Sequence, residues 1–239
     1  MDEATAGGKR VAFFGGSFDP PHLGHLAVAR AARAALRLDT VLFAPVGAQP
    51  LKPKGATAGF EDRLAMTRLA VAGEMGFAVS QLDTPKPADA PNFTLDSLLR
   101  LRAELPPESV LFCLMGADAF FGLRHWHKPA EIPFAAPLIV ASRPGQRVDD
   151  LKAALPEGVA LESAPDAAWT SPAVEVRFYL LRNFAGEIAP FYVLPGLNVE
   201  ISASDIREQL RAAWGARTTG HDLLPDAVAD YIRSHNLYR

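Results

Sequence analysis

The chain has little of what secreted and membrane proteins require. It contains one cysteine, Cys113, among 239 residues, so no disulfide can form within it. No run approaches the roughly 20 consecutive apolar residues that cross a membrane. Residues 1–9 are polar and rich in Gly and Ala, without the apolar centre of a signal peptide. We therefore expect a cytoplasmic protein without a membrane partner, in which residues 1–9 are disordered.

The chain also lacks a marked excess of charge of either sign. Its 24 Lys and Arg residues nearly balance 27 Asp and Glu residues, which gives a formal net charge of −3. This balance provides no bulk attraction to nucleic acid or to an anionic membrane surface. We expect no nucleic-acid partner, and an anionic ligand must be held by local hydrogen-bond donors.

Three familiar motifs are absent as well. The chain has no G-x-x-x-x-G-K-[ST] segment, no G-x-G-x-x-G after its first predicted strand and no G-x-S-x-G segment. These absences exclude a P-loop, a dinucleotide-binding fingerprint and an esterase nucleophile elbow, in that order.

The sequence instead alternates short apolar runs with helical stretches. Continuous apolar strands separated by helices are typical of a parallel sheet that is covered on both faces. Ligands of such sheets bind beyond the carboxyl ends of the strands. The predicted strands are Val11–Gly15, Val41–Pro45, Phe77–Gln81, Val110–Met115 and Leu138–Ser142, and the predicted helices are His25–Leu36, Phe60–Glu74, Thr94–Glu104 and Ala117–Leu123.

The remainder of the chain is less regular. Two long loops, Val46–Gly59 and Thr84–Pro91, are rich in Pro or Gly and serve either as binding loops or as mobile connections. We expect one domain over 10–239, with a small C-terminal helical subdomain over about 202–239. Its further predicted elements are a hairpin that pairs Val174–Leu181 with Ile188–Leu194, a helix from Ser202–Arg207 to about Trp214, and a helix over Asp226–His235.

The most informative segment is the loop after the first predicted strand, GGSFDPPHLGH at residues 15–25, called the first loop below. Its glycines let backbone N–H groups approach a ligand, and the following helix start favours anions. His22 and His25 add further donors or positive charge. Together these features indicate a phosphate-rich ligand. A metal trio of Asp19, His22 and His25 is the weaker alternative, because no cysteine is nearby and no HExxH-type helix supplies a general base.

A second group of donors follows a predicted strand near the C-terminal end of the sequence. Ser202 and Ser204 offer hydroxyl groups at a helix start, and Arg207 lies within its first turn. A guanidinium there can bind phosphate with two hydrogen bonds. The alternative is an ordinary serine cap followed by a solvated arginine.

The first loop resembles the signature G-x-F-D-P-x-H-x-G-H of the nucleotidylyltransferase superfamily. From Val11 onward the chain resembles the nicotinate-nucleotide adenylyltransferases of that superfamily. Ile201–Arg207 is similar to their I-S-[ST]-[ST]-x-[IL]-R motif, with Ala203 as a departure. Met115–Lys128 is similar to their G-A-D and L-x-x-W pattern. Asn92–Leu98 is similar to S-Y-T-x-D-T-L, with Phe in place of Tyr.

The resemblance implies a Rossmann-like, doubly wound α/β fold with a small C-terminal helical portion. It implies adenylyl transfer from ATP to nicotinate mononucleotide, which gives nicotinate adenine dinucleotide and pyrophosphate in NAD biosynthesis. Mg²⁺ should bridge the triphosphate and be held mainly by phosphate oxygens and water, with no metal ligand from the protein.

The resemblance also implies roles for individual residues. Lys52 stands in the place of a P-P-H-K segment whose His is absent here, and Arg143 matches an R-P-G segment. The expected roles are catalysis for His22, His25 and Arg207; ATP binding for Gly15, Gly16, Ser17, Phe18, Gly24, Ser202 and Ser204; and acceptor binding for Asp19, Lys52, Thr94, Asp118, Trp126, His127 and Arg143.

Two other functions stay open at this point. A sister adenylyltransferase would use nicotinamide mononucleotide or phosphopantetheine as acceptor. A regulator would bind the nucleotide without turnover, although the complete set of His22, His25 and Arg207 argues against it. A homo-oligomer is compatible with the sequence.

Overall fold

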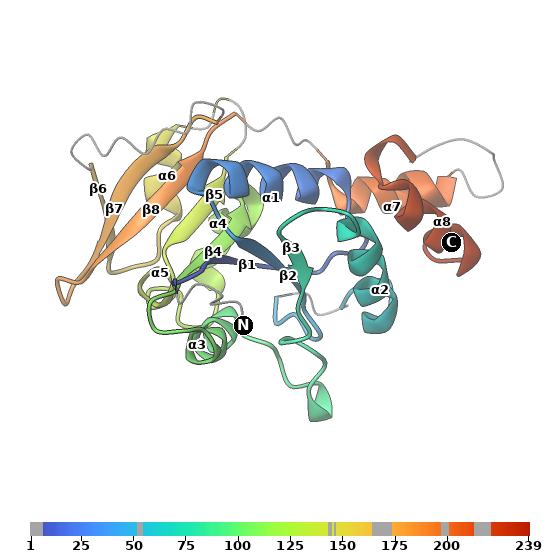
Figure 1. The fold of residues 1–239 in the computed structure, drawn as a ribbon, viewed down its shortest axis with the longest axis horizontal. Coiled ribbons are helices and arrows are strands. Elements are labelled where there is room, and N and C mark those ends of the chain that lie inside the picture. Colours follow the sequence, from blue (N-terminus) through green and yellow to red (C-terminus); the bar gives the residue numbers. More distant parts are fainter. Residues whose placement is uncertain are drawn as a thin grey trace, which may run out of the picture.

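A mixed β-sheet forms the centre of the computed structural model, which describes residues 7–51, 55–142, 145, 147–163, 174–196, 201–212 and 221–239. Within this part of the chain, eight strands are ordered β3-β2-β1-β4-β5-β8-β7-β6 (Figure 1). Their bounds are β1 Arg10–Gly16, β2 Thr40–Pro45, β3 Phe77–Val79, β4 Val110–Gly116, β5 Leu138–Ala141, β6 Val159–Ser163, β7 Arg177–Asn183 and β8 Ile188–Leu194.

The strand order reverses between β1 and β4. From β1 the sheet continues through β2 to β3 on one side, and from β4 through β5 to β8 on the other. All of these neighbours are parallel, whereas β7 runs antiparallel to both β8 and β6. Such a reversal in a parallel sheet opens a crevice at the carboxyl ends of the two strands, and this is where ligands bind.

Helices cover both faces of the sheet, because alternate side chains of each strand point to opposite sides. Phe14 of β1 belongs to an apolar cluster with α1, and the preceding Phe13 belongs to a cluster with α3 and α4. Figure 1 shows α1 above the strands and α3 below them. The helices on the sheet are α1 Leu23–Leu36, α2 Phe60–Val71, α3 Thr94–Glu104, α4 Ala117–Phe121, α5 Ile132–Ala135 and α6 Val148–Ala154.

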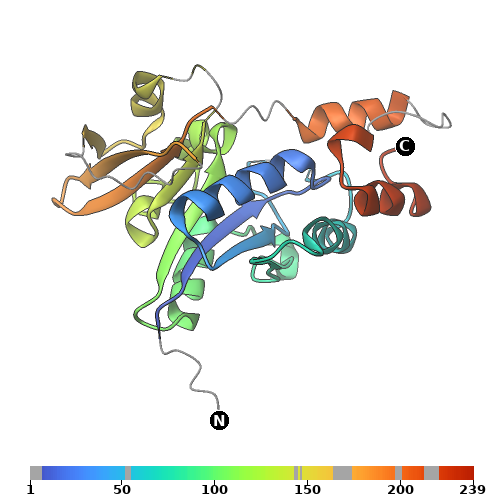
Figure 2. The same ribbon diagram turned by 45° about the horizontal axis from the view of Figure 1, so that its top comes forward.

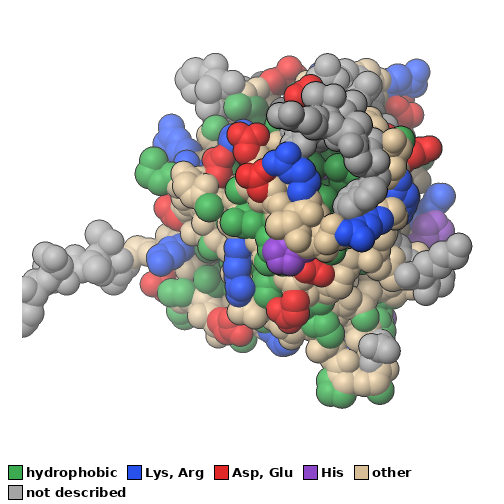
Figure 3. Space-filling model, turned by 90° about the vertical axis from the view of Figure 1, so that its right-hand side faces the viewer, with side chains coloured by type: hydrophobic (Ala, Val, Ile, Leu, Met, Phe, Trp, Pro, Cys, Tyr) green, Lys and Arg blue, Asp and Glu red, His purple; other side chains and the backbone are tan. Residues whose placement is uncertain are grey.

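The C-terminal helices α7, Ala203–Ala212, and α8, Asp226–Ser234, lie at one end of the molecule (Figure 2). A third apolar cluster joins them to α2 and includes Met66, Ile206 and Ile232. On the face at this end, Lys and Arg side chains are interspersed with Asp and Glu (Figure 3). No helix in the described ranges has the length and apolar character needed to span a membrane.

The structure confirms the doubly wound α/β prediction and extends it. The five predicted strands and the hairpin are present, although β3 ends at Val79 and α2 ends at Val71. The short helices α5 and α6 and the strand β6 are not predicted. Cys113 lies mid-strand in β4, and burial raises the pKa of its thiol to about 12. Residues 1–6 of the predicted disordered start and Trp214 lie outside the described residues.

Candidate active site

A cavity of about 570 Å³ opens at the switch point of the sheet. It is lined by the carboxyl ends of β1, β4 and β5, by the first loop and by the start of α7. Every predicted site residue within the described ranges lines this cavity, namely His22, His25, Arg207, Gly15, Gly16, Ser17, Phe18, Gly24, Ser202, Ser204, Asp19, Thr94, Asp118, Trp126 and His127. The other two, Lys52 and Arg143, lie outside the described residues.

Aromatic rings within and next to the first loop pack against one another. The buried Phe18 has a positive φ of 47° and packs its ring edge-on against Phe14, with ring centres 5.7 Å apart. The ring of His25 lies 4.9 Å from the same ring. Gly15 has no room for a side chain, because a Cβ there would lie 2.9 Å from the ring of Phe13. Gly15, Gly16 and Gly24 all line the cavity, so the loop presents backbone atoms to it.

The two histidines of the first loop interact with each other, with ring centres 3.7 Å apart. The backbone N–H of His22 donates to Nδ1 of His25 at 3.2 Å, so a neutral His25 carries its proton on Nε2. Burial lowers the pKa of His22 to about 4. Burial and then the neighbouring His22 lower the pKa of His25 well below 6.5. Both rings are therefore neutral at pH 7 and supply hydrogen bonds rather than positive charge.

One nitrogen of this pair is unsatisfied. Nδ1 of His22 is buried and has no hydrogen-bond partner among the described residues. Buried polar atoms are normally paired, and an unpaired one costs free energy. Because Nδ1 itself is fully buried, His22 lines the cavity through other atoms.

Arg207 joins the start of α7 to the first loop. Its Nη1 donates to the backbone carbonyl oxygen of Asp19 at 2.7 Å, and its Nη2 donates to Ser204 Oγ at 3.1 Å. Ser202 Oγ accepts the N–H of Ser204 at 3.2 Å, as a capping serine does. The Arg207 side chain is 19% exposed and lines the cavity. It is therefore a fixed cationic part of the lining and not a solvated side chain.

The carboxylate of Asp19 is engaged in hydrogen bonds with other groups of the chain. The residue is 4% exposed, and its carboxylate accepts the N–H groups of Thr57 at 2.6 Å and Ala58 at 3.0 Å. It also accepts the hydroxyl of Tyr238 at 2.7 Å. The alternative metal trio with His22 and His25 therefore lacks an available carboxylate. The described residues contain no group of three or more His, Cys, Asp or Glu side chains that could hold a metal ion.

Aromatic side chains line the cavity around the start of α3. This helix begins at Thr94, so its first N–H groups have no partner within the helix. The rings of Phe93 and His127 stack with their centres 4.2 Å apart and their planes at 24°. Trp126 lies beside them in the lining. Aromatic faces suit a heteroaromatic ring, and a helix start suits a carboxylate.

Comparison with known proteins places this arrangement in a family. The profile of the cytidylyltransferase-like family matches residues 13–209. A probable nicotinate-nucleotide adenylyltransferase of Gloeobacter violaceus is 36% identical over 234 residues, which cover 97% of each chain. Its counterpart in Laribacter hongkongensis is 38% identical over 229 residues, which cover 96% of this chain and 94% of the relative. The chain belongs to the nicotinate-nucleotide adenylyltransferase family.

Solved structures agree with the fold of this family. Nicotinic acid mononucleotide adenylyltransferase from Plasmodium falciparum, solved in complexes with APC and with NaAD, has a TM-score of 0.65. The superposition covers 96% of this chain and 97% of the other, at 15% sequence identity. At this identity the likeness establishes the fold alone. It confirms the Rossmann-like prediction, and the family assignment rests on the closer relatives.

The cavity lining also contains polar residues that the sequence analysis did not predict, among them Gln49 and Asp83. Gln49 accepts a hydrogen bond from Ser17 Oγ at 2.8 Å, and so links the loop after β2 to the first loop. Asp83 accepts a hydrogen bond from Ser97 on α3, and burial raises the pKa of its carboxyl group. No local motif marks either residue in the sequence.

Asn92 is another such residue, and its side chain joins the two long loops. Its Oδ1 accepts the N–H of Ala48 at 3.0 Å, and its Nδ2 donates to the carbonyl oxygen of Thr84 at 3.2 Å. Residues 49–51 of the first long loop line the cavity, whereas the second contributes only the residues that flank it. The binding-loop interpretation therefore fits Val46–Gly59 better than Thr84–Pro91.

Proposed function

We propose that this chain transfers the adenylyl group of ATP to nicotinate mononucleotide, in a step of NAD biosynthesis. The observation that carries this proposal is that one cavity combines hydrogen-bond donors for phosphates with a surface for an aromatic ring that bears a carboxylate. The first loop and Arg207 provide donors for phosphates, and the start of α3 with Trp126 and His127 provides aromatic faces and free N–H groups. The substrates have the same two parts, a triphosphate and a pyridine ring with a carboxylate.

The reaction needs no side chain that acts as a general base. An oxygen of the acceptor's phosphate attacks the α-phosphorus of ATP, the bond from that phosphorus to the bridging oxygen breaks, and pyrophosphate leaves. A phosphomonoester has a second pKa of about 6, so this nucleophile is largely dianionic at neutral pH. Catalysis then consists of aligning two anions and stabilising the charge that develops on the leaving group. Neutral imidazole N–H groups, loop amides and a fixed guanidinium suit that task.

We assign the roles within the cavity accordingly. The N–H group at Nε2 of His25, the ring of His22 and the guanidinium of Arg207 contact the reacting phosphates. The ATP side comprises Gly15, Gly16, Ser17, Phe18, Gly24, Ser202 and Ser204, and the acceptor side comprises Thr94, Asp118, Trp126 and His127. Asp19, whose carboxylate is taken up by the chain, shapes the first loop instead of contacting the acceptor.

We propose MgATP as the form of the nucleotide that binds. Mg²⁺ retains several waters and is commonly held by substrate phosphates together with few protein oxygens. The described lining fits this arrangement, because it offers donors to phosphate rather than a cluster of carboxylates. Bound to ATP, the cation would neutralise charge on the triphosphate.

We further propose that residues 10–239 act as one domain in the cytoplasm. The cavity draws on both the sheet and the C-terminal helices, which supports a single functional unit with a helical portion over about 202–239. A buried single cysteine and an ATP-dependent reaction are compatible with a reducing compartment.

The test is pyrophosphate release from MgATP with a panel of acceptors. We expect turnover with nicotinate mononucleotide and much less with nicotinamide mononucleotide or phosphopantetheine. Faster turnover with either of the other acceptors would replace the acceptor assignment by that of a sister enzyme. Tight MgATP binding with no pyrophosphate release from any acceptor would favour a regulator.

A further inference from the structure

Only one of the three groups that donate to the Asp19 carboxylate within the described residues is a side chain, the hydroxyl of Tyr238. Tyr238 lies beyond α8, is 5% exposed and belongs to the apolar cluster of α2, α7 and α8. Its φ of +62° is one that non-glycine residues rarely adopt and that persists only where the surroundings fix it. The segment after α8 is therefore held in a specific conformation that brings a phenol beneath the first loop.

The phenol remains a hydrogen-bond donor at every usable pH. Burial, followed by the negative charge of Asp19, raises the pKa of Tyr238 well above its usual value. Since a buried carboxylate is costly unless its oxygens are paired, loss of this donor would leave Oδ1 of Asp19 with only the N–H of Ala58. The expected response is a change in the orientation of the carboxylate.

Asp19 in turn holds the guanidinium that lines the cavity. Its backbone carbonyl oxygen accepts Nη1 of Arg207 at 2.7 Å, and its Oδ2 lies 3.8 Å from the same nitrogen. A second arginine, the buried Arg63, fixes the neighbouring backbone by donating to the carbonyl oxygens of Ser17 at 2.7 Å and Ala58 at 3.1 Å. Tyr238, Asp19 and Arg207 thus form one chain of contacts that ends at the cavity.

We propose that Tyr238 is a positioning residue for the phosphate-binding side of the cavity, acting through the Asp19 carboxylate on the guanidinium of Arg207. This inference rests on the proposed function in that it takes Arg207 to bind the phosphates of ATP. It assigns to the segment after α8 a part in nucleotide binding, although Tyr238 itself does not line the cavity.

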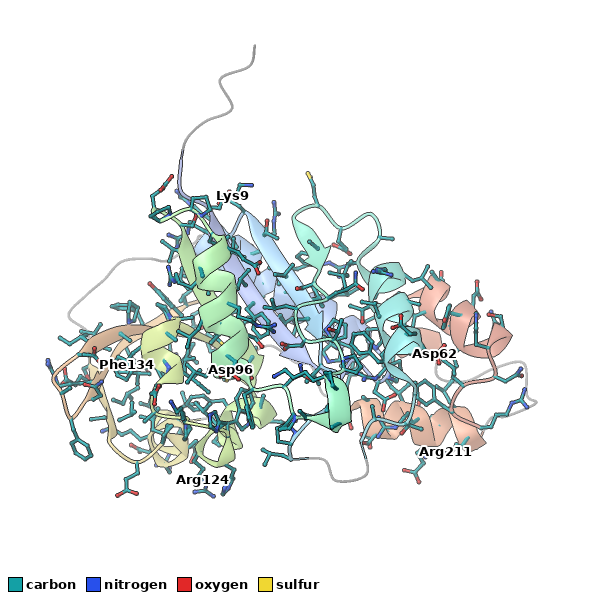
Figure 4. The ribbon with its side chains drawn as sticks, turned by 90° about the horizontal axis from the view of Figure 1, so that it is seen from below. Lys9, Asp62, Asp96, Arg124, Phe134 and Arg211 are labelled. Carbon is teal, nitrogen blue, oxygen red and sulfur yellow. The ribbon has the colours of Figure 1, made fainter. Side chains whose placement is uncertain are left out.

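The test compares Tyr238 with Tyr231, a second tyrosine of the C-terminal helical portion, which lies within α8. Tyr238→Phe removes only the hydroxyl, and we expect kcat/KM for MgATP to fall about tenfold, with KM for the acceptor unchanged within about twofold. Tyr231→Phe is the matched control, because the Tyr231 hydroxyl donates to Asp62 at 3.0 Å, outside the cavity lining. Figure 4 shows Asp62 on α2, beside the C-terminal helices. The control should retain wild-type kinetics.

A double-mutant cycle separates positioning from a general structural role. In an Arg207→Ala background, Tyr238→Phe should reduce kcat/KM for MgATP by less than about twofold further, because the group it positions is gone. If Tyr238 had only a structural role, Tyr238→Phe would lower the melting temperature. In the folded protein it would either leave kcat/KM for MgATP unchanged or reduce it by the same factor with and without Arg207. Either of these two kinetic results overturns the proposal.

A direct measurement of MgATP binding tests this inference separately from the proposed function. If the wild-type protein turns over none of the acceptors, the same cycle is measured as MgATP affinity by calorimetry, with the same tenfold loss and the same lack of additivity expected. Failure of the wild type to bind MgATP at all overturns both proposals. Should Tyr238→Phe not fold, 3-fluorotyrosine at position 238 keeps the hydroxyl. Its ¹⁹F resonance should then shift when MgATP saturates the protein, and an unchanged resonance overturns the positioning role.

Discussion

Nδ1 of His25 accepts the backbone N–H of His22, and this bond leaves the Nε2 proton of His25 available as a donor. We expect His25→Ala to lower kcat about 100-fold, because it removes a donor to charge that develops in the transition state. His22→Ala should have a similar effect. Steady-state pyrophosphate release measures both, with His235→Ala as the control, since His235 is exposed at the end of α8 and stacks on Tyr231. Wild-type turnover in both folded loop variants would exclude the assigned role.

The lowered pKa of His22 also predicts a loss of stability in acid. The folded protein holds His22 neutral down to about pH 4, whereas the unfolded chain takes up the proton near pH 6.5. Between these values the unfolded state binds more protons, so the free energy of unfolding falls as the pH is lowered through this window. The shift corresponds to about 3 kcal/mol between pH 7 and pH 4.

Urea denaturation at several pH values between 7 and 4 measures this effect by difference. His22→Gln lacks the titrating group, so its stability should decline less steeply than that of the wild type. Taking the difference cancels the contribution of groups that do not interact with His22, such as Asp83, whose carboxyl pKa is raised by burial. His25 is not among them, because His22 contributes to its lowered pKa, so the difference reports the histidine pair. Parallel curves for the two proteins would show that His22 is not held neutral by the fold.

Arg207 is expected to act on the nucleotide and not on the acceptor. Arg207→Ala should lower kcat/KM for MgATP by about tenfold to 100-fold, through loss of charge-assisted hydrogen bonds. Arg207→Lys should recover only part of that loss, because a lysine cannot form the two-pronged contact. Arg211→Ala is the control: Arg211 is exposed near the end of the same helix and is labelled in Figure 4. Equal kinetics for the wild type, Arg207→Ala and Arg207→Lys would argue against the contact.

Acceptor choice should depend on the carboxylate of the pyridine ring. A site that directs N–H groups at a carboxylate leaves some of them unpaired against a carboxamide, at about 1–3 kcal/mol each. We therefore expect kcat/KM for nicotinate mononucleotide to exceed that for nicotinamide mononucleotide about 100-fold.

Trp126→Ala tests the ring-binding side of the same hypothesis. Loss of stacking should raise KM for nicotinate mononucleotide about tenfold while leaving KM for MgATP nearly unchanged. The two KM values, each measured at saturation with the other substrate, decide the point. A rise confined to MgATP would move Trp126 to the nucleotide side of the cavity.

The sequence predicts the scaffold of the site well, because that scaffold is locally encoded. The glycines of the first loop, the apolar run of β1 and the helix start at Ser202 are visible as short patterns. The switch point between β1 and β4 follows from their order in a parallel sheet. The neutral state of His22 does not follow, because it depends on burial by residues far away in the sequence.

Long-range polar contacts are the part that no local pattern reveals. The sequence predicts that Asp19 contacts the acceptor substrate. In the structure its carboxylate accepts hydrogen bonds from Thr57, Ala58 and Tyr238, which lie 38, 39 and 219 positions away. Asn92 likewise joins two loops through backbone groups that carry no side-chain signature. Such contacts are fixed by how elements pack, and packing is absent from periodicity and composition.

Isotope transfer distinguishes attack on the α-phosphorus of ATP by a phosphate acceptor from attack at another phosphorus. The protein is incubated with MgATP labelled at the α-phosphate and with nicotinate mononucleotide, and the products are separated. We expect the label to move into nicotinate adenine dinucleotide, with unlabelled pyrophosphate released and no label bound to the protein. Label found in ADP would instead indicate cleavage at the γ-phosphate, and label on the protein would indicate a covalent intermediate; either result would exclude direct attack of the acceptor on the α-phosphorus.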